Sequence, residues 1–291
     1  MTTIPDISEI KIVECPRDAM QGILDFIPTN EKVNYINALL KVGFHTLDCG
    51  SFVSPKIIPQ MRDTEEVLDS IDLSNSSTLL SVIIANGRGA DEAVKYKQVQ
   101  NLGFPFSILE TFQKRNTNKS IIESIDTVKY ILDVCSANDK QMVVYISMGF
   151  GNPYGDEWNA GIVSDWIGKL ADLGVKQFSI SDTVGVSNEQ SIEAVFSKFK
   201  NNDQTLDIGA HFHTTQDAWE GKIKSAYAQG CKKFDGAIRG FGGCPMAKDD
   251  LVGNMPTERL LDFFSNDKLQ LNIKEFQHSV FLADQLFKNY L

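Results

Sequence analysis

The sequence predicts an α/β protein in which strands and helices alternate eight times and close into a (β/α)8 TIM barrel. Short runs of apolar, β-branched and aromatic residues alternate with amphipathic segments of helical length along all 291 residues. A barrel of eight such units takes about 250 residues. No linker or low-complexity segment divides the chain, so we expect one domain over residues 1–291, with the barrel at about 10–265.

The eight expected strands are residues 10–15, 45–50, 79–85, 104–110, 142–148, 177–182, 207–213 and 233–239. Apolar residues recur with the helical period between them, most clearly in residues 30–43, 123–139, 163–175, 188–202 and 218–230. Residues 273–290 predict an extra C-terminal helix beyond the eighth unit. A doubly wound open sheet is the alternative, but it requires a glycine-rich phosphate turn after the first strand, where this chain reads PRDAMQG.

Composition excludes several function classes. The formal net charge is −10 and no basic stripe is present, which argues against nucleic acid as a partner. The longest apolar runs, such as residues 79–84, are far shorter than the roughly 20 residues of a membrane span, so no membrane partner is expected. The first 14 residues resemble neither a signal nor a transit peptide. Five scattered cysteines without CxxC spacing fit a reduced, cytoplasmic location.

Polar residues collect where the predicted strands run into the following helices, which is where TIM-barrel enzymes place their active sites. His211 and His213 lie two residues apart near the end of the seventh strand, so their side chains point to the same face. They are either a ligand pair for one cation or two hydrogen-bonded polar groups. Asp18 after the first strand and Asn254 after the eighth could complete an N/O ligand set that suits Mg²⁺, Mn²⁺ or Co²⁺. Zinc is less favoured without a thiolate ligand.

Two further junctions carry chemistry. Arg17 and Asp18 directly follow the first strand and project in different directions, so Asp18 could ligate while Arg17 offers planar donors to an oxyanion. The alternative is an ordinary solvated ion pair. Cys244 lies in the glycine-rich segment GFGGCPMA, a position suited to proton transfer on an active-site loop, although a buried inert thiol is the default for cysteine.

Several motifs together resemble the 3-hydroxy-3-methylglutaryl-CoA lyase family, the metal-dependent TIM-barrel lyases and aldolases with an Arg-Asp turn after strand one. The resemblance covers about residues 10–265, and its anchors are KIVECPRDAMQ, SFVSPKIIPQM, ETFQKRNTNKS, ISDTVG, HFH and GFGGCPMA followed by GN. It implies that Asp18, His211, His213 and Asn254 are metal ligands for Mg²⁺ or Mn²⁺. It also implies catalytic roles for Arg17, Cys244, Asp182, Glu14 and Asp48, and places Glu258 at an acidic position of the family.

The implied reaction is a retro-Claisen cleavage of hydroxymethylglutaryl-CoA to acetyl-CoA and acetoacetate. Such a reaction requires a cation that lowers the pKa of the C3 hydroxyl, a base that takes its proton and a cation that stabilises the enolate. The resemblance places the base among His211, Asp182 and their neighbours, and assigns the enolate to Arg17. A related lyase or aldolase acting on another 3-hydroxyacyl-CoA or a 2-oxo acid is the alternative. A non-enzymatic barrel would need none of these residues for its core.

The departures from the family pattern bear on the substrate. Asp48 stands where the family has Glu, and the first turn, E-C-P-R-D, is one residue shorter. Further departures occur at Val143, Asn152, Thr214, Thr215 and Arg259.

The expected partner is an acyl-CoA substrate, whose phosphates would need local donors on this acidic chain. The candidate donors are Lys56, Arg88, Lys114 and Arg115. The resemblance also implies a homo-oligomer, expected to be a dimer, and a place in leucine degradation.

Overall fold

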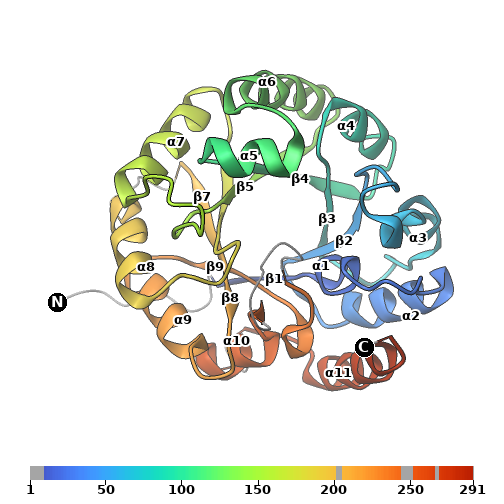
Figure 1. Cartoon of the computed structure of the whole chain (residues 1–291). Coiled ribbons are helices and arrows are strands. Elements are labelled where there is room, and N and C mark those ends of the chain that lie inside the picture. Colours follow the sequence, from blue (N-terminus) through green and yellow to red (C-terminus); the bar gives the residue numbers. More distant parts are fainter. Residues whose placement is uncertain (1–9, 201–204, 244–251, 266–268, 291) are drawn as a thin grey trace.

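Eight parallel strands form a closed barrel, in the order β1-β2-β3-β4-β5-β6-β7-β9, which confirms the TIM barrel (Figure 1). The computed structural model describes residues 10–200, 205–243, 252–265 and 269–290. The barrel strands are β1 (Lys11–Glu14), β2 (Thr46–Ser51), β3 (Leu79–Ile83), β4 (Val99–Ser107), β5 (Gln141–Ser147), β6 (Gln177–Ser181), β7 (Asp207–His211) and β9 (Lys233–Gly236).

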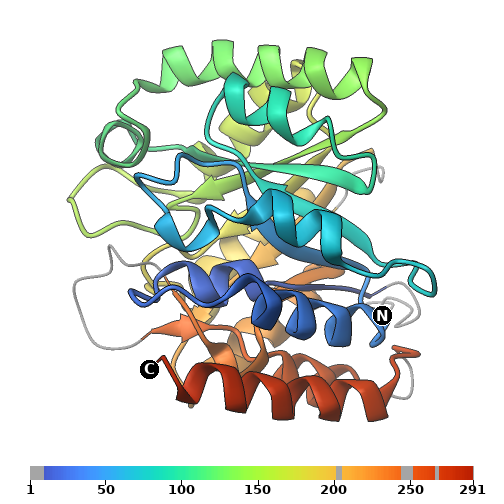
Figure 2. The ribbon, with the colours of Figure 1, turned by 90° about the vertical axis from the view of Figure 1, so that its right-hand side faces the viewer.

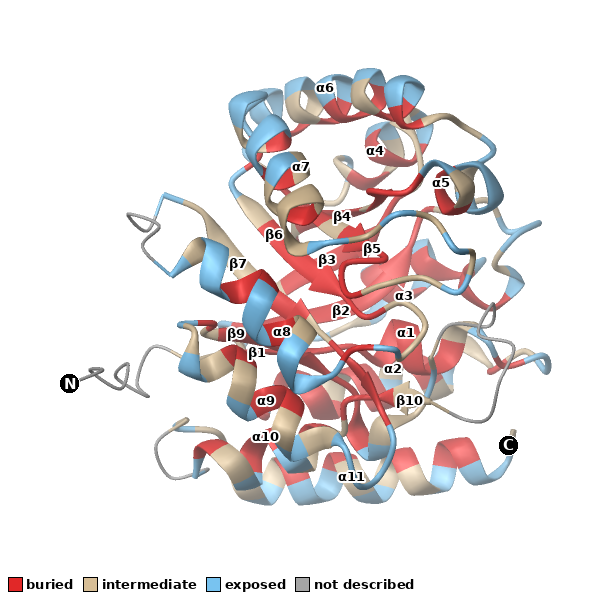
Figure 3. Ribbon diagram, turned by 60° about the vertical axis from the view of Figure 1, so that its left-hand side comes forward, coloured by how far each residue is buried: buried red, intermediate tan, exposed pale blue. Residues whose placement is uncertain are grey.

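Helices surround the barrel and bury one face each against it, as the inward-facing buried positions show (Figure 3). They are α1 (Pro16–Gln21), α2 (Thr29–Leu40), α3 (Thr64–Ser70), α4 (Gly87–Ala93), α5 (Glu110–Thr117), α6 (Ile121–Ala137), α7 (Ala160–Asp172), α8 (Glu189–Phe196), α9 (Trp219–Ala228), α10 (Thr257–Phe264) and α11 (Ile273–Lys288). Short 3-10 turns lie at η2 (Pro59–Met61), η3 (Ser197–Phe199) and η4 (Ile238–Gly240).

Two strands differ from the predicted boundaries by about three residues or more at one end. The fourth begins at Val99 instead of residue 104, because Gln100 and Asn101 join the sheet despite their polarity. The Gln100 side chain accepts a hydrogen bond from the Leu80 backbone at 2.7 Å, which satisfies an amide at the start of the neighbouring strand. The eighth barrel strand ends at Gly236 instead of residue 239, since Arg239 adopts a left-handed φ of 60° that ends the extended backbone.

The predicted C-terminal helix is present as α11, which lies along the outside of the barrel beside α2 (Figures 1 and 2). Aromatic contacts hold it there: the rings of Tyr35 and Phe287, and those of Phe44 and Phe276, lie edge to face with centroids 6.3 Å apart. No helix in the described ranges has the length and apolar character needed to cross a membrane.

Candidate active site

The predicted seventh strand is not continuous, and its interruption shapes the site. β7 ends at His211, and after Phe212 the chain forms a separate short strand, β8 (His213–Thr214). β8 pairs antiparallel with β10 (Gly253–Asn254), so that His213 faces Asn254 across the ladder. A hydrogen bond from the Met255 backbone N to the Phe212 carbonyl, 3.0 Å long, extends this pairing. Residues far apart in sequence are thereby joined at the carboxyl-terminal mouth of the barrel.

The two imidazoles lie close to the Asp18 carboxylate. The ring centroids of His211 and His213 are 5.3 Å apart. One ligand atom from each of Asp18, His211 and His213 lies within 4.8 Å of the other two. A carboxylate and two imidazoles at this spacing can hold one divalent cation.

Asn254 provides an independent test of whether such an ion fits. Its Nδ2 donates to the Asp18 Oδ2 and to the Phe241 carbonyl, both at 2.8 Å. Its Oδ1 is buried without a hydrogen-bond partner among the described residues. A buried amide oxygen without a partner is costly, and a cation bound to this oxygen would supply the missing interaction. The residues therefore fit a divalent metal.

The pKa values of Asp18 and His213 also suit a cation. Burial raises the pKa of Asp18, but Arg17, His211 and His213 outweigh it and hold that pKa at about 2. Burial, reinforced by the neighbouring His211, lowers the pKa of His213 to about 4. At neutral pH Asp18 is therefore ionised and His213 is neutral, which are the protonation states that metal binding requires.

Arg17 lies beside this cluster because the chain turns directly from β1 into α1. Pro16 occupies the first turn of the helix, where its fixed φ and missing N–H are tolerated. The buried Arg17 guanidinium donates to Asp18 Oδ1 at 2.9 Å through Nη1, and to Asp48 Oδ2 at 3.0 Å through Nε and 2.5 Å through Nη2. The site thus holds a fixed cation next to the ligand cluster.

Asp48, in the middle of β2, has a hydrogen-bond partner for only one of its two carboxylate oxygens among the described residues. Arg17 contacts Oδ2, whereas Oδ1 is buried and has no hydrogen-bond partner among the described residues. Burial raises the pKa of Asp48 even though Arg17 opposes the shift. A carboxylate with a free oxygen and a raised pKa is suited to accept a proton.

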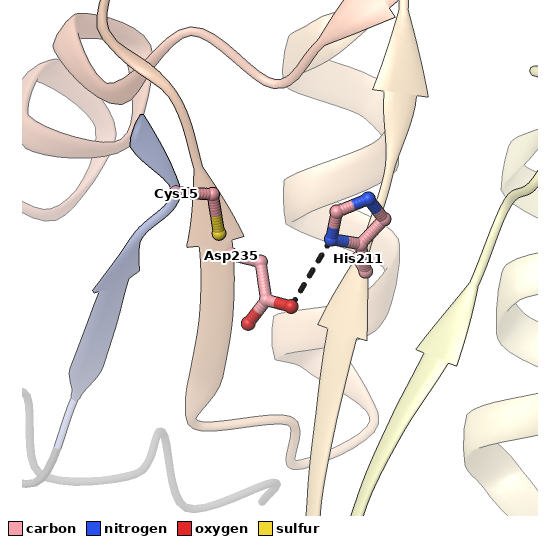
Figure 4. Close-up of side chains that lie close together, drawn as sticks. All are labelled: Cys15, His211 and Asp235. Carbon is pink, nitrogen blue, oxygen red and sulfur yellow. Dashed lines mark hydrogen bonds and ion pairs between the residues drawn. The ribbon is translucent and has the colours of Figure 1, made fainter. Parts of the chain in front are cut away.

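Asp235 on β9 is a site residue that the sequence analysis missed. Its Oδ2 lies 3.1 Å from His211 Nδ1 (Figure 4). The same oxygen accepts a hydrogen bond from the Ser179 hydroxyl at 3.0 Å. This contact directs Nδ1 of His211 toward Asp235 and leaves Nε2 as the nitrogen for a metal ion, as an outer carboxylate commonly does for a metal-binding histidine. An aspartate inside an apolar strand is the only sequence signal for it.

Two predicted catalytic carboxylates are engaged elsewhere. Asp182 accepts hydrogen bonds from the backbone and hydroxyl of Ser187, at 3.1 and 2.5 Å, and forms an ion pair of 2.9 Å with the buried Lys222. Lys222, also missed from the sequence, donates in addition to the His213 carbonyl at 2.7 Å. Asp182 therefore supports the backbone beneath His213.

Glu14 lies against the start of α10. Its two oxygens accept hydrogen bonds from the Ile238 backbone at 2.9 Å and from the Thr257 hydroxyl at 2.5 Å. Burial raises its pKa to about 8, which these two hydrogen bonds only partly oppose. Cys244 lies outside the described residues.

The positions that depart from the family pattern have local partners. Asn152 caps a turn by accepting from the Tyr154 and Asp156 backbones at 2.9 and 3.1 Å. Arg259 lies over the Trp219 ring, 5.2 Å from its centroid. Val143 is buried on β5, whereas Thr214 is buried in β8 and Thr215 is exposed.

Comparison with protein-family models matches this chain to one family. The profile described as HMGL-like matches residues 9–278. The chain is 30% identical over 259 residues to the hydroxymethylglutaryl-CoA lyase YngG of Bacillus subtilis, covering 89% of this chain and 86% of that protein. It is also 30% identical over 264 residues to the mitochondrial hydroxymethylglutaryl-CoA lyase of Mus musculus, covering 90% and 79%.

Solved structures agree with the sequence relatives. The Bacillus subtilis HMG-CoA lyase superposes with a TM-score of 0.88 at 26% identity, covering 97% of this chain and 94% of that one. An HMG-CoA lyase from Acinetobacter baumannii in complex with coenzyme A and 3-methylmalate gives a TM-score of 0.86 at 26% identity, covering 96% and 92%.

Proposed function

We propose that this chain, which belongs to the HMGL-like family, is a hydroxymethylglutaryl-CoA lyase. It would cleave 3-hydroxy-3-methylglutaryl-CoA to acetyl-CoA and acetoacetate in a retro-Claisen reaction. The observation that carries the proposal is the cluster of Asp18, His211 and His213, with the free Asn254 Oδ1 beside it and Arg17 directly adjacent. The curated relatives with which it shares 30% identity over most of their length have this activity by name.

Asp18, His211, His213 and Asn254 would hold the divalent ion, which we propose is Mg²⁺ or Mn²⁺. Such an ion acts as a Lewis acid that binds substrate oxygens and lowers the pKa of a hydroxyl. The donor set of carboxylate, amide and imidazole suits ions of this hardness.

Three other side chains have proposed roles in the proton transfers and in stabilising the enolate. Asp48, with its unpartnered Oδ1 and raised pKa, is better placed than Asp182 to take the C3 hydroxyl proton, because Asp182 is bound to Lys222 and Ser187. Arg17 would then stabilise the enolate oxygen that forms when the carbon–carbon bond breaks, since a buried fixed cation loses little energy to reorganisation. Cys244, by its resemblance to the family's loop cysteine, would deliver the proton that quenches the enolate.

An acyl-CoA substrate would need donors for its phosphates, and three of the four candidate donors have described neighbours. Of the candidate phosphate donors, Arg115 lies over the Tyr154 ring, 4.5 Å from its centroid, and Lys114 pairs with Glu110 at 3.1 Å. Arg88 lines a surface cavity of about 420 Å³ between α4 and α6. A dimeric state, a cytoplasmic location and a role in leucine degradation remain predictions.

The test is a coupled assay for acetoacetate, run on chelator-treated protein from hydroxymethylglutaryl-CoA with and without added Mg²⁺ or Mn²⁺. We expect turnover that requires the added ion. Absence of turnover by folded, metal-loaded protein would overturn the assignment. Cleavage of another 3-hydroxyacyl-CoA or a 2-oxo acid under the same conditions would then support the alternative, which the shorter Asp48 carboxylate and the changed Thr214 favour.

A further inference from the structure

A second cluster of ligand-type side chains lies next to the predicted magnesium or manganese site. One atom from each of Cys15, His211 and Asp235 lies within 4.8 Å of the others. The three residues come from adjacent parts of the barrel: Asp235 is the register partner of both Val13 on β1 and His211 on β7. Figure 4 shows the Cys15 thiol and the Asp235 carboxylate pointing toward the same space beside His211.

We propose that Cys15, Asp235 and the Nδ1 atom of His211 form a separate binding site for a thiophilic divalent ion such as Zn²⁺. Sulfur, imidazole nitrogen and carboxylate oxygen are the ligands that zinc accepts in three-residue sites, with water as the fourth ligand. The site differs from the Asp18 cluster in its donor set, because only this one includes a thiol. Cys15 also lies in the shortened first turn, the departure E-C-P-R-D.

Two observations beyond the clustering support a cation at this position. The Oδ1 atom of Asp235 is buried without a hydrogen-bond partner in the part of the chain that the structure describes. Among the described residues, the hydrogen bond given for the Cys15 thiol is a long one, 3.8 Å to the Val13 carbonyl.

The two ions exclude each other through His211. A neutral imidazole has one nitrogen with a free lone pair, while the other carries a proton. With Nδ1–H directed at Asp235, Nε2 is free for the ion beside Asp18 and His213. When zinc binds Nδ1, the imidazole proton moves to Nε2, and the Cys15 thiol loses its proton to water as the Zn–S bond forms. Zinc binding therefore removes a ligand from the Asp18 site and releases one proton.

The first experiment uses Co²⁺ as the probe and the full-length protein. Cobalt bound to a thiolate gives a near-ultraviolet charge-transfer band. We expect this band in the wild-type protein and its loss in Cys15→Ser. The matched controls Cys231→Ser and Cys244→Ser should retain the band. Absence of the band in the wild type, its persistence in Cys15→Ser, or its loss only in Cys244→Ser would each overturn the proposal.

The second experiment requires no variant that must fold. X-ray absorption of wild-type protein with one equivalent of Zn²⁺ should show one sulfur neighbour at about 2.3 Å. Zinc coordination without sulfur would contradict the site.

Binding titrations of variants give a third test. Cys15→Ser should weaken zinc affinity by more than about 100-fold, which is the upper end of the loss for an outer-shell partner. Asp18→Asn should leave zinc affinity within a few-fold of wild type.

Competition tests the shared histidine. Added Zn²⁺ should release bound Mn²⁺ one for one in the wild type, measured as the signal of free Mn²⁺ by electron paramagnetic resonance. Simultaneous binding of both ions at full occupancy would contradict a shared His211. Binding at this site does not depend on the proposed lyase activity, and none of these measurements uses turnover, so the failure of one proposal is distinguishable from failure of the other.

Discussion

The two ends of the barrel both carry charged side chains but arrange them differently. At the amino-terminal end, Asp207 accepts from Lys11 at 3.0 Å and lies 3.4 Å from Lys233, which also donates to Gln177 at 3.1 Å. At the carboxyl-terminal mouth, Asp48, Asp235 and Asn254 each keep one buried oxygen without a partner among the described residues. One end has its polar groups paired, and the other leaves acceptors free.

The paired charges at the amino-terminal end contribute to stability, whereas the unpartnered acceptors at the mouth are available to bind a ligand. Paired charges lower the free energy of the folded state only modestly, and they leave nothing for a ligand to contact. Buried acceptors without partners cost free energy, and such costs persist where a ligand repays them. Arg17 is paired, but it is placed to act on a ligand because it lies beside Asp18 and the histidines.

The largest effect is expected from removing the Arg17 charge. Arg17→Met should lower turnover of hydroxymethylglutaryl-CoA by about 10² to 10³, the usual loss for one donor to a developing oxyanion. Affinity for Mn²⁺ should be retained, because Arg17 donates to Asp18 but is not itself a ligand. Steady-state kinetics and a Mn²⁺ titration measure the two effects. The matched control at the opposite end, Lys11→Met, should keep wild-type turnover; equal losses in both variants would remove the distinction between the ends.

The raised pKa of Glu14 predicts that the free energy of unfolding depends on pH. Its folded-state pKa of about 8 exceeds the ordinary value of 4.5, with burial as the main cause. Between these values the folded state holds a proton that the unfolded state has lost, so the free energy of unfolding falls as pH rises, by up to about 1.4 kcal/mol per pH unit, and levels off above pH 8.

Glu14→Gln should flatten this decline in denaturant titrations between pH 5 and 8, because the amide cannot ionise. Glu66→Gln, an exposed carboxylate on α3, serves as the control and should show the wild-type slope. An unchanged slope in Glu14→Gln would contradict the assignment of a protonated Glu14.

A smaller effect, on stability, is expected from Asp207, which pairs with Lys11 and Lys233 at the amino-terminal end of the barrel. Asp207→Asn should lower the free energy of unfolding by about 1 to 3 kcal/mol, less than for a fully buried pair, because the Asp207 side chain is 30% exposed. Turnover at saturating metal should not change. Denaturant titration measures the loss, and Asp126→Asn, from the exposed pair with Lys129, should cost no more than about 0.5 kcal/mol. A large loss of turnover in Asp207→Asn would mean that this end also serves catalysis.

The barrel could be predicted from the sequence because apolar periodicity reports burial directly. The interruption at Phe212 could not, since β8 depends on a partner, β10, that lies about forty residues later in the chain. The start of the fourth strand was missed for a related reason: Gln100 accepts a hydrogen bond from the Leu80 backbone and Asn101 is buried, and a local pattern contains neither feature.

For the site, the sequence indicated which residue types could bind a metal but not how their neighbours would orient them. Asp18, His211 and His213 do come together. Asp235 and Lys222 were not predicted. The partners of a lone aspartate in a strand or a lone lysine in a helix are tertiary contacts, which the sequence alone does not reveal. The same limit applies to Asp182, whose engagement with Lys222 is a tertiary feature.

The most direct test of the central claim, that the carboxyl-terminal mouth is a metal centre, is a Mn²⁺ titration of the wild-type protein and His213→Ala followed by electron paramagnetic resonance. We predict one tight site in the wild type and an affinity at least about 100-fold weaker in the variant, since loss of a ligand should exceed the loss of an outer-shell partner. Equal Mn²⁺ affinity in the two proteins would contradict the ligand assignment.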